Sequence, residues 1–235
     1  MRGYAAGMSA AVLPHLPDEA SWPRRILVGF QTLMVLKDDP GNPKAGALIN
    51  RAFDYEVYEA HIQRMKDSPE GARLLSERPS LERDDLDLEA LAALPAGTLG
   101  RALVDYFETN GFPPFNTDQP IDDEHDYISK RYRETHDSYH VVTGYGTDGM
   151  GEMELQAFVM GNLGIKSPWV IMSFSYPQTG LMEHKLSPRR YVSLLREAWR
   201  RGRAARPFLE FPFEAHWATP LDEVRRMLLG EGGAK

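Results

Sequence analysis

Asp123–Met160 reads DEHDYISKRYRETHDSYHVVTGYGTDGMGEMELQAFVM, and this stretch contains the residues around which the chain is organised. Two histidines, His136 and His140, stand four residues apart, and Asp137 directly follows the first of them. On a helix that advances by about 100° per residue, these three side chains lie within an arc of about 100°. The spacing therefore predicts a helix that presents two imidazoles and a carboxylate on one side.

The same stretch predicts where this helix begins and ends. Asp122 or Asp123 can act as its N-cap residue, and Gly144 suits the position just past its C-terminus. Three further glycines allow the chain to reverse before a second helical run, GEMELQAFVM, which Glu152 opens. Because the two helices adjoin in sequence, we expect Glu152 to return towards the histidines.

Imidazole nitrogens and carboxylate oxygens are ligands that a divalent metal binds in proteins, with room left for water or a substrate. Candidate metal ligands and candidate catalytic residues are therefore the same four residues: His136, Asp137, His140 and Glu152. Histidine pairs with this spacing also occur on exposed helix surfaces, where they bind no metal. Spacing alone leaves both interpretations open.

The four candidate ligands form the pattern H-D-x-x-H-x11-E, which resembles the signature of the coenzyme Q (ubiquinone) biosynthesis family, proposed to bind zinc. The resemblance covers most of the chain from about Arg25 onward. It departs from the family pattern at Ser138 and Tyr139, where a more hydrophobic, aromatic pair is typical. The other segments that carry it are SERPSL (76–81), TLGRALVDYFETNGF (98–112), RYRETHD (131–137), EAWRRGRAARPFL (197–209) and HWATPLDEVRRML (216–228).

The resemblance implies an enzyme of ubiquinone biosynthesis that acts on a polyprenylated 4-hydroxybenzoate-type intermediate, with an isoprenoid tail of unspecified length. The implied reaction is an oxidative decarboxylation, which replaces the carboxylate at ring C1 by a hydroxyl group. The resemblance also implies zinc as the metal, while iron or manganese would accept the same ligands. Since zinc cannot change its oxidation state, O2 would be activated by the electron-rich ring or by another metal such as iron.

A second interpretation is a non-catalytic, lipid-binding subunit that organises other ubiquinone biosynthesis proteins and contains a structural metal. Two histidines and two carboxylates can close a four-ligand structural zinc site, so the sequence leaves both roles open. A zinc peptidase of the H-E-x-x-H class is a weaker third alternative, because Asp137 is one methylene shorter than the glutamate base of that class. A homo-oligomer is left open in each case.

The composition excludes several classes of function. The chain has 235 residues, of which 42% are hydrophobic, and can bury a sizeable core. The absence of cysteine excludes disulfides, thiolate metal sites and cysteine nucleophiles. A formal net charge of −7 argues against general nucleic-acid binding. Any metal must therefore be bound by histidine and carboxylate.

The apolar segments are short. The longest ones, residues 26–36 and 169–174, fall below the about 20 residues that a membrane-spanning helix needs. The N-terminal residues lack the features of a secretory or transit peptide. We therefore expect the protein in the bacterial cytoplasm, with a peripheral contact to the inner membrane left open.

Residues 188–207, PRRYVSLLREAWRRGRAARP, carry seven arginines and one glutamate in an otherwise acidic chain. Tyr191, Leu194, Leu195 and Trp199 share one face of a predicted helix, and the arginines flank this face. The composition suits contact with a membrane surface or a phosphate-bearing lipid. A helix that packs by its apolar face and exposes a solvated basic back explains the same pattern and is the more common case.

Helix signals dominate the whole chain, and strand signals are few. We expect a mostly α fold, a single-domain multi-helix bundle over residues 24–230, preceded by an irregular segment over residues 1–23. The metal motif should lie on two adjoining helices of this bundle. Residues 169–176 suit either a helix or a strand. The other predicted helices cover residues 24–37, 43–65, 68–78, 87–94, 98–110, 187–201 closed by Gly202, and 219–229 with a capping box at Thr219 and Asp222.

Overall fold

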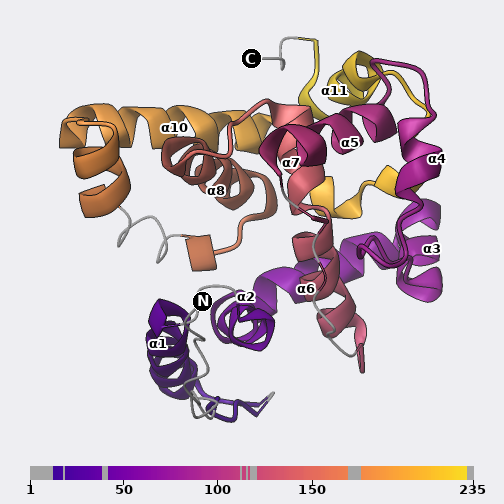
Figure 1. Cartoon of the computed structure of the whole chain (residues 1–235). Coiled ribbons are helices and arrows are strands. Elements are labelled where there is room, and N and C mark those ends of the chain that lie inside the picture. Colours follow the sequence, from indigo (N-terminus) through magenta and orange to yellow (C-terminus); the bar gives the residue numbers. More distant parts are fainter. Residues whose placement is uncertain are drawn as a thin grey trace, which may run out of the picture. The chain divides into compact units, whose positions relative to one another are not determined.

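Helices make up the regular structure of the chain (Figure 1). The computed structural model describes residues 13–17, 19–38, 42–111, 113–114, 116, 121–168 and 176–231. Within these ranges there is no β-strand, which confirms the prediction of a mostly α fold. Residues 169–175, predicted as helix or strand, lie outside the described residues. The elements in chain order are α1 (Trp22–Asp38), α2 (Pro43–Lys66), α3 (Pro69–Glu77), α4 (Leu88–Ala92), α5 (Leu99–Asn110), α6 (Glu124–Glu134), α7 (His136–Thr143), α8 (Gly149–Leu163), a π-helical turn η1 (Tyr176–Glu183), α10 (Pro188–Ala204), the 3-10 turns η2 (Phe208–Glu210) and η3 (Phe213–Ala215), and α11 (Leu221–Leu229).

The chain divides into two compact units, residues 1–53 and 54–235. In the first unit, α1 and the first part of α2 bury a small core that includes Leu16, Val28 and Ala52. The second unit contains the other helices and the large core. The single domain over residues 24–230 stays a prediction. In the part of the chain that the structure describes, no helix has both the length and the apolar character needed to cross a bilayer.

Several helix ends follow local signals in the sequence. Three of the predicted helices begin at a residue whose side chain accepts a hydrogen bond from a backbone N–H in the first turn, at 3.0, 2.9 and 3.3 Å: Ser68, Asp87 and Ser187. The capping box predicted at Thr219 and Asp222 is wrong, because Pro220 is the N-cap residue of α11 and no side chain bonds to the helix there. Proline has no hydroxyl or carboxylate with which to cap.

The prediction of a single helix over residues 122–144 is wrong in one respect. The helical segment breaks at Thr135 into α6 and α7. The Thr135 hydroxyl donates a hydrogen bond of 2.7 Å to the carbonyl of Arg131, one turn earlier. A threonine that bonds back to its own helix competes with the backbone ladder and favours a bend. His136 consequently begins a new helix.

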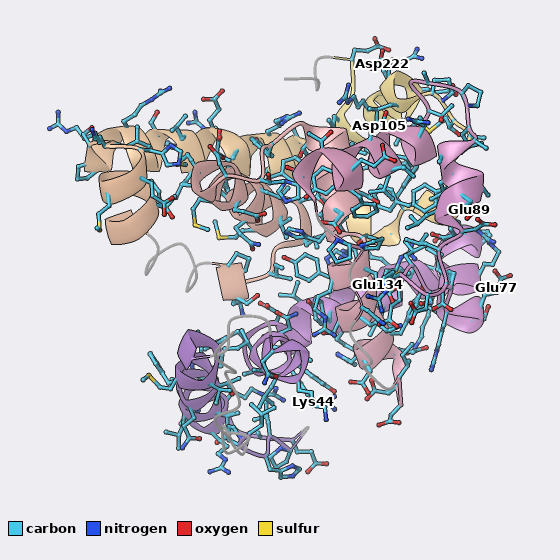
Figure 2. The ribbon with its side chains drawn as sticks, in the orientation of Figure 1. Lys44, Glu77, Glu89, Asp105, Glu134 and Asp222 are labelled. Atoms are coloured by element: carbon cyan, nitrogen blue, oxygen red, sulfur yellow. The ribbon has the colours of Figure 1, made fainter. Side chains whose placement is uncertain are left out.

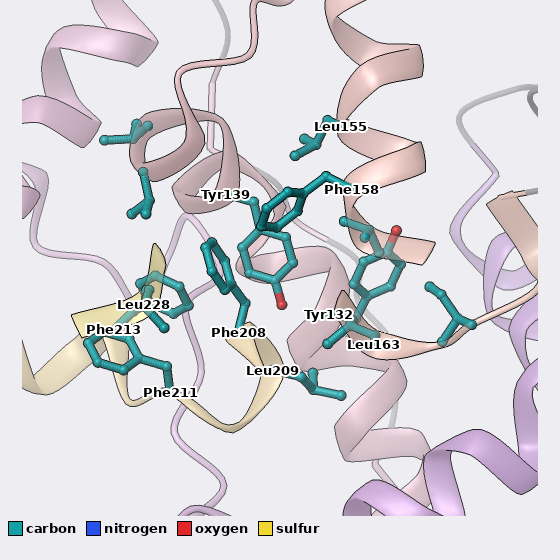
Figure 3. Close-up of a cluster of buried hydrophobic side chains, with 14 of the residues drawn as sticks. Tyr132, Tyr139, Leu155, Phe158, Leu163, Phe208, Leu209, Phe211, Phe213 and Leu228 are labelled. Atoms are coloured by element: carbon teal, nitrogen blue, oxygen red, sulfur yellow. The ribbon is translucent and has the colours of Figure 1, made fainter. Parts of the chain in front are cut away.

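Aromatic rings form the centre of the core in the larger unit (Figure 3). Phe208 packs edge to face against Tyr139 of α7 and Phe158 of α8, with ring centroids 5.1 and 5.2 Å apart. Phe213 adds a fourth ring, 5.9 Å from that of Tyr139. One aromatic cluster therefore contacts both helices of the predicted metal motif and sets their positions.

Glycines set the spacing of α8 and α10, the most extensive helix pair of this unit (Figure 1). A Cβ at Gly161 of α8 would collide with the backbone carbonyl of Trp199, and one at Gly202 of α10 would collide with that of Phe158. The prediction that Gly202 closes α10 is wrong, since the helix continues to Ala204. This glycine permits a close backbone contact and does not end the helix.

Replacing Gly202 by alanine is expected to destabilise the protein by about 1–3 kcal/mol, the usual cost of inserting a methyl group into a well-packed contact. The carbonyl of Phe158 belongs to the backbone and cannot rotate away from the new Cβ. Urea unfolding followed by circular dichroism measures the change. The control is Ser193→Ala at an exposed position of α10, which should stay within about 0.5 kcal/mol of wild type. Equal stability of both variants would contradict the close contact.

Most carboxylates lie on the surface, as Figure 2 shows for Asp105 and Asp222, but Glu134 does not. The Glu134 side chain is 1% exposed and forms an ion pair with Lys130 at 2.7 Å. Lys130 also lies 3.2 Å from a carboxylate oxygen of Glu82, in the loop that follows α3. These buried pairs tie α6 to that loop.

Candidate metal centre

The loop between α7 and α8 brings the two parts of the motif together. Gly144, which follows α7, has a φ of 77° in the left-handed region, as the sequence predicted for this helix end. Asp148 caps α8 by accepting a hydrogen bond of 2.7 Å from the N–H of Gly151. A Cβ at Gly151 would collide with the carbonyl of Gly146, so this tight return requires glycine. Glu152 therefore lies in the first turn of α8 and faces α7.

Three of the four predicted ligands come together. His136, His140 and Glu152 each offer one donor atom, and these atoms lie within 4.8 Å of one another. Carboxylate oxygens of Glu152 lie 3.1 Å from Nε2 of His140 and 3.9 Å from Nε2 of His136. The two imidazole rings meet edge to face, with centroids 4.9 Å apart. This contact follows from the four-residue spacing, which places both rings on neighbouring turns.

One nitrogen of the buried His140 ring has a hydrogen-bond partner among the described residues, and the other has none. Nδ1 lies 3.1 Å from the carbonyl oxygen of Tyr145, which can only accept, so Nδ1 carries a proton. In the neutral ring Nε2 then offers a lone pair, and it has no hydrogen-bond partner among the described residues. One carboxylate oxygen of Glu152 lies 3.1 Å from this nitrogen, so a cation could be shared between the two groups. Since buried polar atoms nearly always have partners, this nitrogen marks a place where a cation fits.

The electrostatic surroundings of His140 favour a positive charge. Burial lowers the pKa of His140, but the carboxylate of Glu152, the carbonyl of Tyr145 and the charge of Asp137 raise it by more. The pKa therefore lies above the ordinary value of histidine. Because a proton and a metal ion compete for the same lone pair, surroundings that stabilise the imidazolium also attract a divalent cation.

Asp137, the fourth predicted ligand, stands apart from this group. Its Oδ1 lies 3.9 Å from Nδ1 of His136 and accepts a hydrogen bond of 3.4 Å from the hydroxyl of Tyr106. Tyr106 belongs to α5, and its ring stacks on that of His140 with centroids 5.6 Å apart. Burial and the charges of Asp137 and Glu152 raise the pKa of Tyr106, so the phenol stays protonated and donates. Tyr106 is not among the site residues predicted from the sequence, because α5 reaches the site only through the tertiary fold.

The donor set of the three-residue group fits a divalent metal ion. Two imidazoles and one carboxylate are the ligands of one class of catalytic zinc site, and iron or manganese bind the same donors. The contact between His140 and the Tyr145 carbonyl is of the kind that orients metal-bound histidines. His136, His140 and Glu152 are therefore the residues that could bind a metal here.

The loop between α7 and α8 also lines an open pocket of about 530 Å³. Asp148, Glu154 and His184 contribute titratable side chains to it, and none of the three candidate ligands lines it. This polar pocket is therefore separate from the metal group and does not suit an isoprenoid tail.

Comparisons with known proteins point to one family. The family model described as "Coenzyme Q (ubiquinone) biosynthesis protein Coq4" matches residues 20–230. The mitochondrial ubiquinone biosynthesis protein COQ4 homolog of Mus musculus is 34% identical over 168 residues, which are 70% of this chain and 62% of the mouse protein. The homolog of Bos taurus is 28% identical over 231 residues, 97% of this chain and 85% of that protein. The COQ4 protein of Laccaria bicolor is 32% identical over 215 residues, 90% of this chain and 70% of that protein.

A solved structure shares the fold. The crystal structure of a candidate ubiquinone biosynthesis protein from Nostoc punctiforme PCC 73102 matches with a TM-score of 0.68 at 25% sequence identity. The match covers 89% of this chain and 98% of that chain. Because the family model spans nearly the whole chain and the solved structure has the same helical fold, this chain belongs to the Coq4 family of coenzyme Q (ubiquinone) biosynthesis proteins.

Proposed function

We propose that this protein catalyses a metal-dependent step of ubiquinone biosynthesis, the oxidative decarboxylation of a polyprenylated 4-hydroxybenzoate-type intermediate at ring C1. The observation that carries the proposal is the group of His136, His140 and Glu152, with donor atoms within 4.8 Å of one another and a buried imidazole nitrogen that lacks a hydrogen-bond partner among the described residues. Family membership supports the pathway, because the relatives are described as ubiquinone biosynthesis proteins.

The proposed reaction exchanges one substituent of an aromatic ring. The bond between C1 and the carboxylate carbon breaks and CO2 leaves, while a bond forms between C1 and an oxygen atom from water. The two electrons that the ring loses pass, with two protons, to O2, which leaves as H2O2. His136, His140 and Glu152 would hold a divalent metal, which would supply a Lewis acid for the carboxylate or phenolate of the substrate. The burial of His140 keeps bulk water from its side of the site, which strengthens electrostatic interactions there.

The position of Asp137 bears on whether the metal is catalytic or structural. Structural zinc sites normally have four protein ligands, whereas catalytic sites have three and keep one position open. Asp137 bonds to Tyr106 and is not gathered with the other three residues, which supports a three-ligand catalytic site. The second candidate function, a lipid-binding organising subunit with a structural metal, needs Asp137 as the fourth ligand.

Replacing either histidine by alanine is expected to abolish metal binding, because each supplies one of only three donors. Wild-type protein purified without chelators should carry about one divalent ion per chain, whereas His136→Ala and His140→Ala should carry none by elemental analysis. The matched control is His125→Ala, since His125 is also followed by an aspartate but contacts Glu59 and lies outside the group. A wild-type protein that neither carries nor takes up a divalent metal would remove the basis of the proposal.

We further propose that the outer face of α10 contacts an anionic membrane surface, at the cytoplasmic side of the bacterial inner membrane. Tyr191 and Ala198 on the opposite face are buried, so the apolar face of α10 packs inside the protein and leaves the basic face for such a contact. Four exposed arginines fall within an arc of about 60° along the helix: Arg189, Arg196, Arg200 and Arg203.

Binding to anionic vesicles is expected at low salt and should decrease as the salt concentration rises. Each arginine near an anionic bilayer contributes about 1 kcal/mol, and salt screens this attraction. Flotation with phosphatidylglycerol-containing and with neutral vesicles measures the binding, and the Arg189→Ser/Arg196→Ser/Arg200→Ser variant should lose it. Equal partitioning of wild-type protein onto both kinds of vesicle would count against an electrostatic contact.

A further inference from the structure

The C-terminal end of α7, the helix with both histidines, is held by residues from outside the motif. The helix has only eight residues, and isolated helices of that length are unstable in water. The last four carbonyl groups of any α-helix lack a partner within the helix. The groups that bond to these carbonyls therefore help to hold α7 in the position that the aromatic cluster gives it.

Arg225 of α11 donates hydrogen bonds to two of these four carbonyls. Its Nη2 donates to the carbonyl of Val141 and its Nε to that of Val142, both at 3.1 Å. The preceding carbonyl, on His140, accepts the N–H of Gly144 at 2.8 Å. The planar guanidinium suits such a paired contact, because its donors are held in a rigid fork.

Arg201 of α10 donates a hydrogen bond to the last of the four carbonyls and also contacts Tyr145, which orients His140. Its Nη2 donates to the carbonyl of Thr143 at 2.8 Å. Its guanidinium lies over the ring of Tyr145, 5.1 Å from the centroid, in a cation–π geometry. The carbonyl of the same Tyr145 accepts the hydrogen bond from Nδ1 of His140. One arginine therefore holds both the end of α7 and the residue whose carbonyl sets the tautomer of His140.

We propose that Arg201 and Arg225 are positioning residues of the metal centre, which hold the His140 imidazole in place through the end of α7 and through Tyr145. This inference rests on the proposed metal site. Neither arginine is a candidate ligand, so each acts on the metal only through the backbone or ring that it contacts. Outer contacts of this kind typically change metal affinity by about 10–100-fold when they are removed. The positive charge of both arginines also offsets the negative end of the α7 dipole.

Metal affinity of folded variants tests the proposal. Zn2+ binding is measured by competition with a chromophoric chelator, at a temperature where circular dichroism shows each variant to be folded. Arg201→Ala and Arg225→Ala should bind Zn2+ at least about 10-fold more weakly than wild type. The controls are Arg190→Ala and Arg226→Ala, exposed arginines on the same two helices, which should bind like wild type. Wild-type affinity in both folded test variants would overturn the positioning role.

Lysine variants separate positioning from folding. Arg201→Lys and Arg225→Lys retain the charge but lose the fork geometry, so they should recover the fold fully and metal affinity only in part. They also replace any alanine variant that does not fold. Full recovery of Zn2+ affinity by both lysine variants would show that the paired N–H donors of the guanidinium are not needed, and would overturn the role assigned to them.

A measurement on metal-free protein keeps this inference distinct from the proposed function. The 15N chemical shifts of the His140 imidazole report which nitrogen carries the proton. At alkaline pH, where the ring is neutral, wild-type protein should show a proton on Nδ1, because that nitrogen faces the Tyr145 carbonyl, and Arg201→Ala should show a mixture of tautomers. A wild type without metal affinity contradicts the proposed function, while this shift still supports the positioning role. Unchanged His140 signals in Arg201→Ala would overturn it.

Discussion

A strain that lacks this protein and carries the Glu152→Ala variant is expected to make no ubiquinone above the level of the uncomplemented strain. A polyprenylated hydroxybenzoate-type intermediate that retains its C1 carboxylate should accumulate instead. Glu152 is the one carboxylate of the three-residue group and lies 3.1 Å from Nε2 of His140. Since even contacts outside the ligand set change metal affinity by about 10–100-fold, removal of this ligand should weaken metal binding by at least ~10-fold.

Lipid extraction followed by mass spectrometry measures both compounds in the same cells. The control is Glu154→Ala, on the same helix but outside the metal group, which should restore ubiquinone. Glu152 is 35% exposed in the first turn of α8, so its truncation should leave the protein folded. Normal ubiquinone levels with the Glu152→Ala protein would show that the metal is not catalytic and would favour the organising subunit.

Arg131→Ala is expected to lower the free energy of unfolding by about 3–5 kcal/mol, the cost of removing one partner of a buried ion pair. Arg131 is fully buried, and its Nη2 lies 3.1 Å from the carboxylate of Glu214. Nε and Nη2 also donate to the carbonyls of Leu209 and Phe211, at 3.2 and 2.7 Å. Each buried carbonyl that loses its donor costs about 1–3 kcal/mol, so these contacts alone reach the expected range.

Urea unfolding monitored by circular dichroism measures this loss. The matched control is Lys66→Ala, which removes an exposed ion pair with Glu124 and should cost no more than about 1 kcal/mol. The segment that Arg131 holds includes Phe208, the ring on which Tyr139 of α7 packs. A variant as stable as the control would contradict the view that Arg131 anchors this segment beneath the site.

The sequence by itself determined the features that depend on neighbouring residues. Ser68 and Asp87 bond to backbone groups three residues away, so their caps follow from local order alone. The contact between His136 and His140 follows from helical geometry in the same way. The return of Glu152 needed only a short loop rich in glycine.

Only the tertiary structure decided which residues far apart in the sequence contact each other. Asp137 bonds to Tyr106, 31 positions away, and Arg201 and Arg225 reach α7 from 58 and up to 84 positions away. Gly202, which by local pattern would end a helix, permits a backbone contact within one. The physical reason is that a glycine, an arginine or a tyrosine suits several environments, and the backbone or side chain packed against it selects one. The packing of the whole core determines which group lies against each of these residues. A pattern of neighbouring residues in the sequence does not contain this information.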